Sequence, residues 1–379
     1  MAAEASLGAI ARAKGAALLE QFSSNAAQRK VMRAMADCRT AALGGHRDRC
    51  DSCGFEHVFW NSCRDRHCPG CGGQARQLWL DGRRDEVLDV PYFHVVFTIP
   101  EVLNVLALHA PEVVYAILLR AAGQALLDLG ASRLRARMGI LTVLHTWGQT
   151  LVFHPHVHCV VPGGGFSLDG RRWARVRKVS FLFAVKPLSR RFRTLFCNAV
   201  RAAYADGSLL IPTEFLADPQ ALELLIARSH KTDWHAYAKP PFGGPEHVLA
   251  YLANYTHRIA ISNRRILSFN GETVTFSWRD YADDNAQKTM ELDAVEFLRR
   301  FLQHVVPLRF TRVRYYGFLA NRDRAANIAR ARELIGSKRP CLPRPTIPDP
   351  RLCPQCRKGT MRRLAPVDPQ CDRTWFDTS

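Results

Sequence analysis

The chain of 379 residues carries 53 lysines and arginines against 34 acidic residues, which gives a formal charge of +19. Such an excess of positive charge predicts a polyanionic partner, with nucleic acid as the first choice. A hydrophobic content of 47% supplies a sizeable core and excludes a disordered chain. No apolar run reaches the roughly 20 residues that span a bilayer. Residues 1–22 lack the apolar block of a signal peptide, so we expect a cytoplasmic protein without a membrane partner.

Helical periodicity marks the first 35 residues, and we assign 1–37 to an N-terminal helical segment. The cysteines that follow are clustered, which favours metal binding over a disulfide framework. The knuckles Cys50-Asp51-Ser52-Cys53 and Cys68-Pro69-Gly70-Cys71 each offer two thiolates, and together they predict one structural zinc site. We assign 38–85 to this zinc-binding module.

Four further candidate zinc ligands lie between or beside those knuckles in the sequence and could bind a second zinc ion. They are Cys38, His46, Cys63 and His67. The alternative is that the two cysteines are buried as small apolar side chains while the histidines face solvent or DNA. Residues 336–379 form a Pro-rich linker and a tail, in which Cys353 and Cys356 make another knuckle. Cys341 and Cys371 could complete a site there, and free thiols remain an equal alternative.

The middle of the chain predicts strands around one long helix. Tyr92–Ile99 alternates and ends at a proline, Pro111–Leu129 is helical, and two β-rich runs follow. The first of these runs contains His145, and the second is Phe153–Val161. Side chains alternate along a strand, so His156 and His158 share a face, about 7 Å apart. With His145 as a third group, the pattern predicts a metal site.

The remaining elements are mostly helical by pattern. An Asn270-Gly271 turn between β-rich arms predicts a hairpin. The predicted helices are Leu188–Tyr204, Pro212–Ser229, Leu292–Val306 and Asp323–Ile335, and Arg309–Phe318 is a predicted strand.

A short helix is expected after Pro245-Glu246, with Tyr251 and Tyr255 one turn apart on one face. Such a pair usually packs in a core. The basic residues after it favour a phosphate partner instead. The candidate DNA-binding residues are His257, Arg258, Arg264 and Arg265.

These residues resemble a known family. His156-Val157-His158 is similar to the His-hydrophobic-His motif of the HUH endonucleases, and the segment Tyr251–Tyr255 resembles the paired catalytic tyrosines of their two-tyrosine branch. The cysteine module, with its run Asn61–Cys71, resembles that of the two-tyrosine rolling-circle insertion-sequence transposases. The resemblance extends over about 38–321, most of the chain.

The resemblance implies an α+β fold, in which a central antiparallel sheet flanked by helices carries the histidines, with an N-terminal zinc-binding module. It implies a catalytic domain over 86–335 that nicks and rejoins single-stranded DNA at element ends through a 5′-phosphotyrosine on Tyr251 or Tyr255. A divalent cation, Mg²⁺ or Mn²⁺, would bind His156 and His158. His145 is the third ligand by analogy with relaxase-type sites, and Gln149 and His154 remain candidates.

Two other functions compete with a transposase. A plasmid replication initiator or relaxase would use the same chemistry, and a zinc protein that binds nucleic acid without catalysis would use the same charge. The N-terminal zinc module favours the transposase, since it resembles a DNA-end reader attached to a nuclease. The sequence does not determine the oligomeric state.

Overall fold

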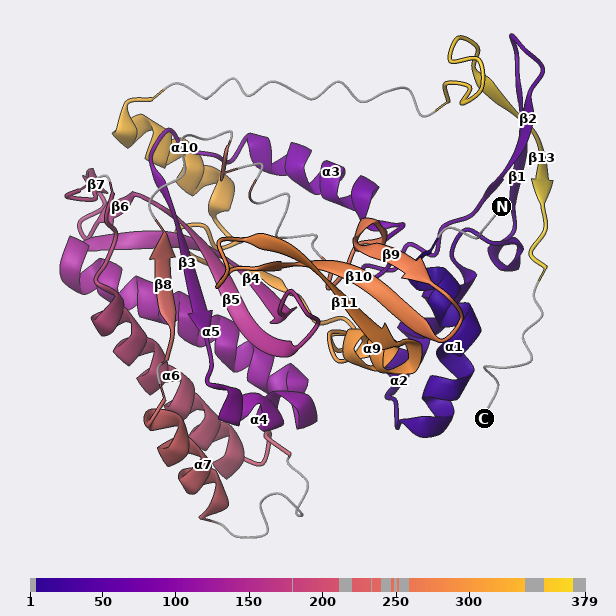
Figure 1. Cartoon of the computed structure of the whole chain (residues 1–379). Coiled ribbons are helices and arrows are strands. Elements are labelled where there is room, and N and C mark those ends of the chain that lie inside the picture. The colour runs from indigo at the N-terminus through magenta and orange to yellow at the C-terminus, as the bar shows by residue number, and fades with distance from the viewer. Residues whose placement is uncertain are drawn as a thin grey trace.

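The structure is a computed structural model that describes residues 5–178, 180–210, 220–232, 234–239, 247–248, 251, 259–337 and 351–370. Figure 1 shows a central sheet with helices, a smaller body of helices and strands beside it, and a strand hairpin that projects away from both. The α+β fold with a central antiparallel sheet is therefore confirmed.

The central sheet has seven strands, in the order β7-β6-β4-β5-β3-β8, with β12 paired to β4. Every pairing is antiparallel, and β5 lies between β3 and β4. The strands are β3 (Tyr92–Thr98), β4 (Ala136–Trp147), β5 (Phe153–Pro162), β6 (Gly164–Ser167), β7 (Trp173–Arg175), β8 (Ala236–Lys239) and β12 (Val313–Gly317). The strands predicted around 92–99, 145 and 153–161 are confirmed.

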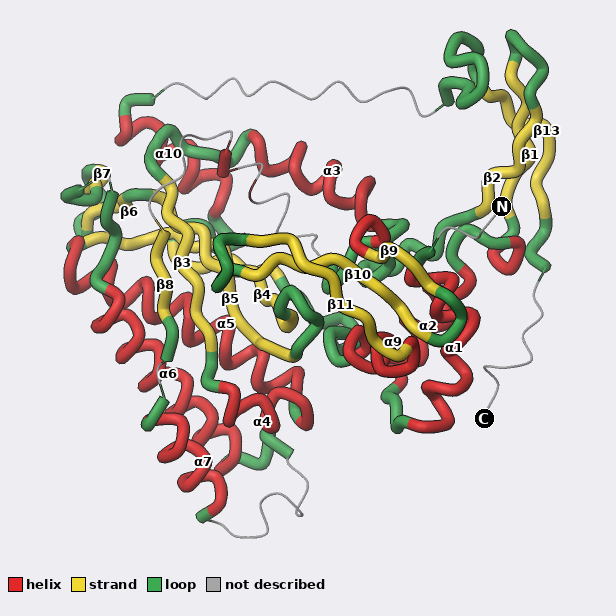
Figure 2. Tube along the Cα trace, viewed as in Figure 1, coloured by secondary structure: helices red, strands yellow, loops and turns green. Residues whose placement is uncertain are grey.

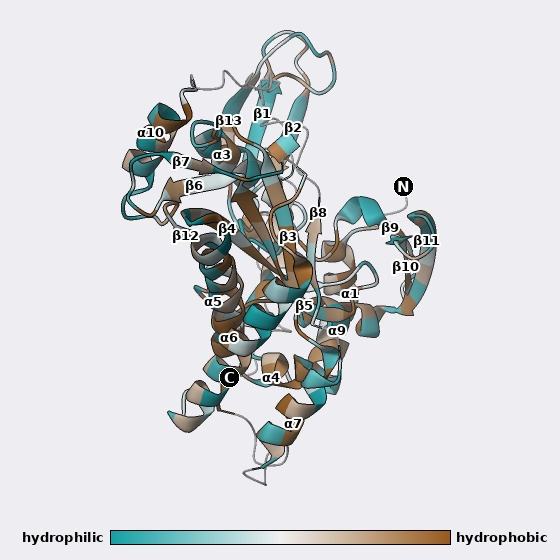
Figure 3. Ribbon diagram, turned by 90° about the vertical axis from the view of Figure 1, so that its left-hand side faces the viewer, coloured by the Kyte–Doolittle hydropathy of each residue, from teal (hydrophilic) through white to brown (hydrophobic). Residues whose placement is uncertain are grey.

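One face of this sheet is the main hydrophobic core. Phe97, Leu144 and Val157 project from neighbouring strands on that face and are fully buried under helices. Figure 3 shows hydrophobic residues, coloured brown, along the long helix that lies beside the strands. The helices of this layer are α4 (Asn104–His109), α5 (Pro111–Leu129), α6 (Val185–Ala205) and α7 (Ala221–His230).

Helix α5 begins at Pro111, whose fixed φ suits the first turn, and its bounds match the predicted helix. Residues 111–134 are long and apolar enough to cross a membrane by composition, and most of that window is buried inside the protein. Since α5 packs between the sheet and α6, its apolar surface belongs to the core of the fold.

The opposite face of the sheet carries the histidines and a second apolar cluster. The cluster joins Val143 and Val160 of the sheet to Trp79 and Ile328 of two helices, α3 (Gly72–Arg84) and α10 (Arg324–Ile335). Figure 2 shows both helices on the side of the sheet away from α5 and α6. Helix α10 ends at Gly336, which has φ +73° and closes the helix in the left-handed conformation.

The smaller body contains the N-terminal helices together with a segment about 250 residues later in the chain. Phe276 and Phe297 are fully buried there against Met32. Its elements are α1 (Leu7–Gln21), α2 (Ala26–Asp37), β9 (Ile266–Phe269), β10 (Thr273–Asp280), β11 (Ala286–Asp293) and α9 (Ala294–Leu302). Asp293 caps α9 through the backbone N–H groups of Val295 and Glu296, so the helix predicted from Leu292 begins two residues later.

The predicted hairpin around residue 270 forms, with its turn one residue further along. Asn270 N–H donates to the carbonyl of Thr273, so the central residues are Gly271 and Glu272. The Asn270 side-chain oxygen accepts from the N–H groups of Glu272 and Thr273, and Gly271 has φ +101°. The asparagine therefore precedes the two central residues of the turn, and its side chain stabilises the turn by these hydrogen bonds.

The projecting hairpin is a three-stranded antiparallel sheet in the order β13-β1-β2. Its strands are β1 (Gly45–Cys50), β2 (Glu56–Trp60) and β13 (Met361–Val367). The tail after the Pro-rich linker thus supplies a strand, which the sequence pattern did not predict. Single helical turns complete the described elements: η1 (Ala41–Leu43), η2 (Glu101–Leu103), η3 (Gly130–Leu134) and η4 (Asn263–Arg265).

His304 connects the smaller body to the loop between β4 and β5. Its Nε2–H donates to the carbonyl of Leu151 over 3.1 Å, and Nδ1 lies 3.3 Å from the hydroxyl of Thr146. The carbonyl can only accept, so Nε2 carries the proton and Nδ1 accepts from the hydroxyl. Burial lowers the pKa of His304 to about 4.

This pKa predicts acid sensitivity of the fold. An unfolded histidine titrates near 6.5, so between about 6.5 and 4 the unfolded chain binds a proton that the folded chain does not. Stability is then fully present above pH 6.5 and falls as the pH drops, by up to about 3 kcal/mol. Urea unfolding at several pH values should show that His304→Gln removes this loss, and that His109→Gln, at an exposed site, does not. Equal pH profiles for wild type and His304→Gln would contradict the assignment.

Candidate metal centre and nucleophile

Three histidines meet on the open face of the central sheet. His145 of β4 is the register partner of His156 on β5, and His158 follows two residues later on the same face. Their ligand atoms all lie within 4.8 Å of one another. His145 and His158 are buried, while His156 is half-buried at the edge of a cavity. The sequence prediction named these three residues, and the structure brings all three together.

A main-chain contact orients His156. Its Nδ1 lies 2.6 Å from the carbonyl of His154, which can only accept, so Nδ1 carries the proton and Nε2 has the lone pair. The ring of His145 stacks on Trp147 at 4.6 Å, which fixes its plane. Three imidazole nitrogens at these separations can bind one divalent cation. The donor set therefore fits a metal ion.

The two other candidate ligands lie outside the three-histidine group. The Gln149 amide donates to the hydroxyl of Tyr281 over 2.8 Å. His154 stands two residues before His156 on the same face of β5, is exposed, and has its ring centroid 5.3 Å from that of His156. Both residues line the cavity in front of the histidines.

Tyr251 reaches the same group from a separate segment. Its hydroxyl lies 3.2 Å from Nδ1 of His158 and makes a short hydrogen bond to Nε2 of His94. His94 Nε2 lies in turn 2.8 Å from Nδ1 of His158. Tyr255, His257 and Arg258 lie outside the described residues.

Sequence reasoning missed His94. It lies on β3, diagonal to His158, and is buried with 3% exposure. A signal was present, because a histidine stands at a core position of the otherwise apolar run Tyr92–Thr98. In a strand between two others, such a polar side chain needs a partner.

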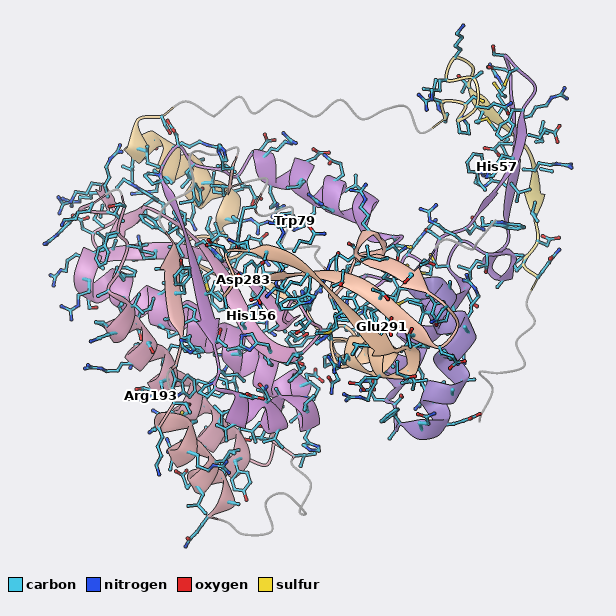
Figure 4. The ribbon with its side chains drawn as sticks, in the orientation of Figure 1. His57, Trp79, His156, Arg193, Asp283 and Glu291 are labelled. Carbon is cyan, nitrogen blue, oxygen red and sulfur yellow. The ribbon has the colours of Figure 1, made fainter. Side chains whose placement is uncertain are left out.

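A cavity of about 700 Å³ opens in front of the histidines. The β10–β11 hairpin of the smaller body forms its far wall, and Figure 4 shows His156 close to Asp283 of that hairpin in the view. Basic and aromatic side chains line the space, which suits a nucleotide. They include Trp147, Tyr237, Arg265, Trp278, Arg279 and Tyr281.

The two predicted arginines before the hairpin differ in their surroundings. The Arg265 guanidinium donates to the carbonyls of Ser277 and Gln149, so it joins the hairpin to the β4–β5 loop while lining the cavity. Arg264 is exposed. Arg265 thus has a structural role in addition to any contact with a ligand.

The cysteines form two groups, which differ from the predicted sets. The inner cysteine site consists of Cys38, Cys63, Cys68 and Cys71, and the outer cysteine site of Cys50, Cys53, Cys353 and Cys356. The predicted set of Cys50, Cys53, Cys68 and Cys71 is therefore wrong. The reason is the hairpin: β1 has six residues and extends over about 20 Å, which carries its knuckle away from the other.

The predicted second set of Cys38, His46, Cys63 and His67 does not assemble either. His67 Nδ1 lies 3.0 Å from Asp65, and its Nε2 accepts the N–H of Val306, so both ring nitrogens are used. His46 stacks on Phe59 in the hairpin at 5.7 Å. Cys38 and Cys63 instead complete the inner site with the second knuckle. Cys341 and Cys371 lie outside the described residues.

The inner cysteine site is part of the smaller body. The Sγ atoms of Cys38 and Cys63 lie 3.4 and 3.6 Å from that of Cys71. The four cysteines pack against the core that α1, α2 and α9 share. A hydrogen bond from Cys63 holds the pKa of the Cys38 thiol far below its usual value, which favours the thiolate that binds zinc.

The three histidines on neighbouring antiparallel strands form an HUH-like triad, and a tyrosine hydroxyl lies beside it. Two family models match the chain: "Transposase zinc-binding domain" over residues 10–99 and "Putative transposase", the two-tyrosine transposase model, over residues 139–326.

Curated relatives agree with these models. "Putative transposase y4qJ" of Sinorhizobium fredii is 44% identical, over 98% of each chain. "Transposase for insertion sequence element IS801" of Pseudomonas savastanoi pv. phaseolicola is 29% identical, over 80% of this chain and 73% of its own length. No solved structure matches the chain. The protein belongs to the IS91 family of two-tyrosine transposases with a zinc-binding domain.

Proposed function

We propose that this transposase nicks and rejoins single-stranded DNA at the ends of its element, with Tyr251 as a nucleophile. The observation that carries the proposal is the position of the Tyr251 hydroxyl, 3.2 Å from His158 in the three-histidine group. The same hydroxyl also meets Nε2 of His94, so a proton acceptor lies beside the proposed nucleophile.

The reaction is a phosphoryl transfer in which bond energy is conserved. The Tyr251 oxygen forms a bond to phosphorus while the bond from phosphorus to the 3′ oxygen breaks. The tyrosine proton leaves toward the imidazole of His94, and the departing 3′ oxygen gains a proton. A divalent cation bound by His145, His156 and His158 would neutralise charge on the non-bridging oxygens. The products are a 5′-phosphotyrosine and a free 3′ hydroxyl, which can reverse the reaction.

The three imidazoles also indicate which cation suits the site. Mg²⁺ prefers oxygen ligands and exchanges its water slowly, whereas nitrogen ligands favour a transition-metal ion. Between the two ions expected from the resemblance, the donor set favours Mn²⁺.

Tyr255 would serve as a second nucleophile, one helical turn from Tyr251. Two nucleophiles allow two successive cleavages with both DNA ends held, which a rolling-circle transfer requires. His257 and Arg258 follow two residues later in the chain, and we propose that they contact phosphate together with the exposed Arg264.

A second surface suits DNA recognition. The projecting hairpin has a groove of about 980 Å³ at its base. Arginine and aromatic side chains both line it, a combination that stacks bases and attracts phosphates. The lining includes Arg39, Arg64, Arg351, Arg363, His57 and Phe59. We propose that this groove holds part of an element end, in a protein that works in the cytoplasm beside its DNA.

A covalent-adduct assay tests the proposal. The protein is incubated with 3′-end-labelled single-stranded DNA of its element end, with Mn²⁺, Mg²⁺ or a chelator, and run on a denaturing gel. We expect label to migrate with the protein in the presence of a cation, more with Mn²⁺ than with Mg²⁺. DNA retention under native conditions without any adduct would instead indicate a binding protein without catalysis.

A further inference from the structure

We propose that Cys50, Cys53, Cys353 and Cys356 bind a structural zinc ion of their own, which joins the N-terminal hairpin to the C-terminal segment. The two knuckles are 300 residues apart in the chain and face each other in the outer cysteine site. Neither family model reaches Cys353 or Cys356, since the models end at residues 99 and 326.

The sulfur separations fit one tetrahedral zinc ion. Cys50 Sγ lies 3.7 Å from Cys356 Sγ, and Cys53 Sγ lies 3.8 Å from Cys353 Sγ. A Zn–S bond of about 2.3 Å gives a tetrahedron whose edge is about 3.8 Å. A disulfide requires sulfurs about 2.05 Å apart, so these pairs stand at metal-ligand distance.

Both knuckles have the backbone turn that presents thiolates to a metal. In the first, the N–H groups of Ser52 and Cys53 point to Cys50 Sγ at 3.4 and 3.5 Å. In the second, the N–H of Gly359 points to Cys356 Sγ at 3.4 Å. Such contacts stabilise negative charge on sulfur.

The second knuckle fits closely against the first at Gly359. A Cβ atom on Gly359 would lie 2.5 Å from Cys50 Sγ and 2.5 Å from the Cβ of Ser52. The Asp51 carboxylate accepts the N–H of Thr360 and also meets Arg362. The C-terminal segment around Gly359 therefore packs closely against the Cys50–Cys53 knuckle at the end of β1.

The hairpin has too little core to fold by burial alone. Its apolar cluster contains Cys50, Cys353 and Met361 as buried members, with Phe55 and Phe59 partly buried beside them. Three short strands with so small a core are marginal in water, and a metal ion supplies the missing free energy in modules of this size. Figure 1 shows that the hairpin extends away from the main cores.

Metal content of full-length variants tests the site. Cys50→Ser/Cys53→Ser and Cys353→Ser/Cys356→Ser should each lose one zinc per chain relative to wild type. Because the four ligands share one ion, the quadruple variant should lose the same single zinc, not two. Cys341→Ser/Cys371→Ser is the matched control in the same tail and should lose none. A quadruple variant that loses two ions, or a Cys353→Ser/Cys356→Ser variant with unchanged zinc, would overturn the proposal.

A measurement on the wild-type protein covers the case in which a variant fails to fold. Cobalt substitution should give thiolate charge-transfer absorption. Chelation should then remove hydrogen-exchange protection from β1 and β13 together, while α5 keeps its protection. Protection of β13 that persists after all thiolate-bound metal is gone would show that the segment docks without metal.

Discussion

Replacement of His156 or His158 by alanine should abolish cation-dependent cleavage of single-stranded DNA and leave DNA binding largely intact. Each variant removes one of three nitrogens that lie within 4.8 Å of one another. Loss of a bound cation removes several kcal/mol of transition-state stabilisation, so the cleavage rate should fall by about a thousandfold or more. DNA affinity depends mainly on lysine and arginine contacts to phosphate, which these variants do not alter.

His154→Ala is the matched control for this prediction. His154 lies on the same strand and lines the same cavity, outside the three-histidine group. Its variant should retain cleavage within about tenfold of wild type, since no metal ligand is lost. Gel-based cleavage rates and binding isotherms, both measured in Mn²⁺, decide between the outcomes. Full activity of His156→Ala or His158→Ala would refute the metal assignment.

The second large effect concerns Tyr251. Tyr251→Phe keeps the ring packed 4.6 Å from that of His94 and removes only the hydroxyl. The adduct on this residue should therefore disappear without loss of stability. If Tyr255 is the second nucleophile, the double variant Tyr251→Phe/Tyr255→Phe should form no adduct at all, while each single variant retains only the chemistry of the other tyrosine.

Tyr281 provides a control inside the same cavity. Its hydroxyl accepts a hydrogen bond from Gln149 and lies across the cavity from the histidines. Tyr281→Phe should leave adduct formation unchanged. Peptide mapping of the wild-type adduct gives an independent answer: DNA on Tyr281, Tyr315 or Tyr316 would mean that another segment supplies the nucleophile.

Local sequence patterns predicted the three histidines of the site, because these lie on two strands that are close together in the sequence. The strands of His145 and His156 are β-rich runs separated by a short connection, so their pairing and the shared face of three histidines followed from alternation. Tyr251 was predicted from its motif. Its contact with His94 could not be predicted, because it depends on how a distant segment returns to β3.

The cysteines show the limit of such reasoning. Knuckles with the same spacing are chemically equivalent, so nothing local decides whether Cys50 pairs with Cys68 or with Cys353. The partner depends on the extent of the hairpin and on the return of the chain end as β13, both of which are long-range properties. Likewise, β11 alternates between half-buried and exposed residues, and it becomes a strand because β10 and the core of α9 are beside it.

The pairing of β1 with β13 has a consequence for synthesis of the protein. The ribosome adds about 5–20 residues per second, so the 300 residues between Cys53 and Cys353 take roughly 15–60 s. During that interval β1 has only β2 as a neighbour, and its other edge offers unpaired backbone groups to any strand nearby. A second nascent chain on the same messenger RNA can present its own copy of β1 at that time. Two arginines and one aspartate of β1, Arg47, Arg49 and Asp48, place charge along this strand and oppose such pairing until the chain end arrives.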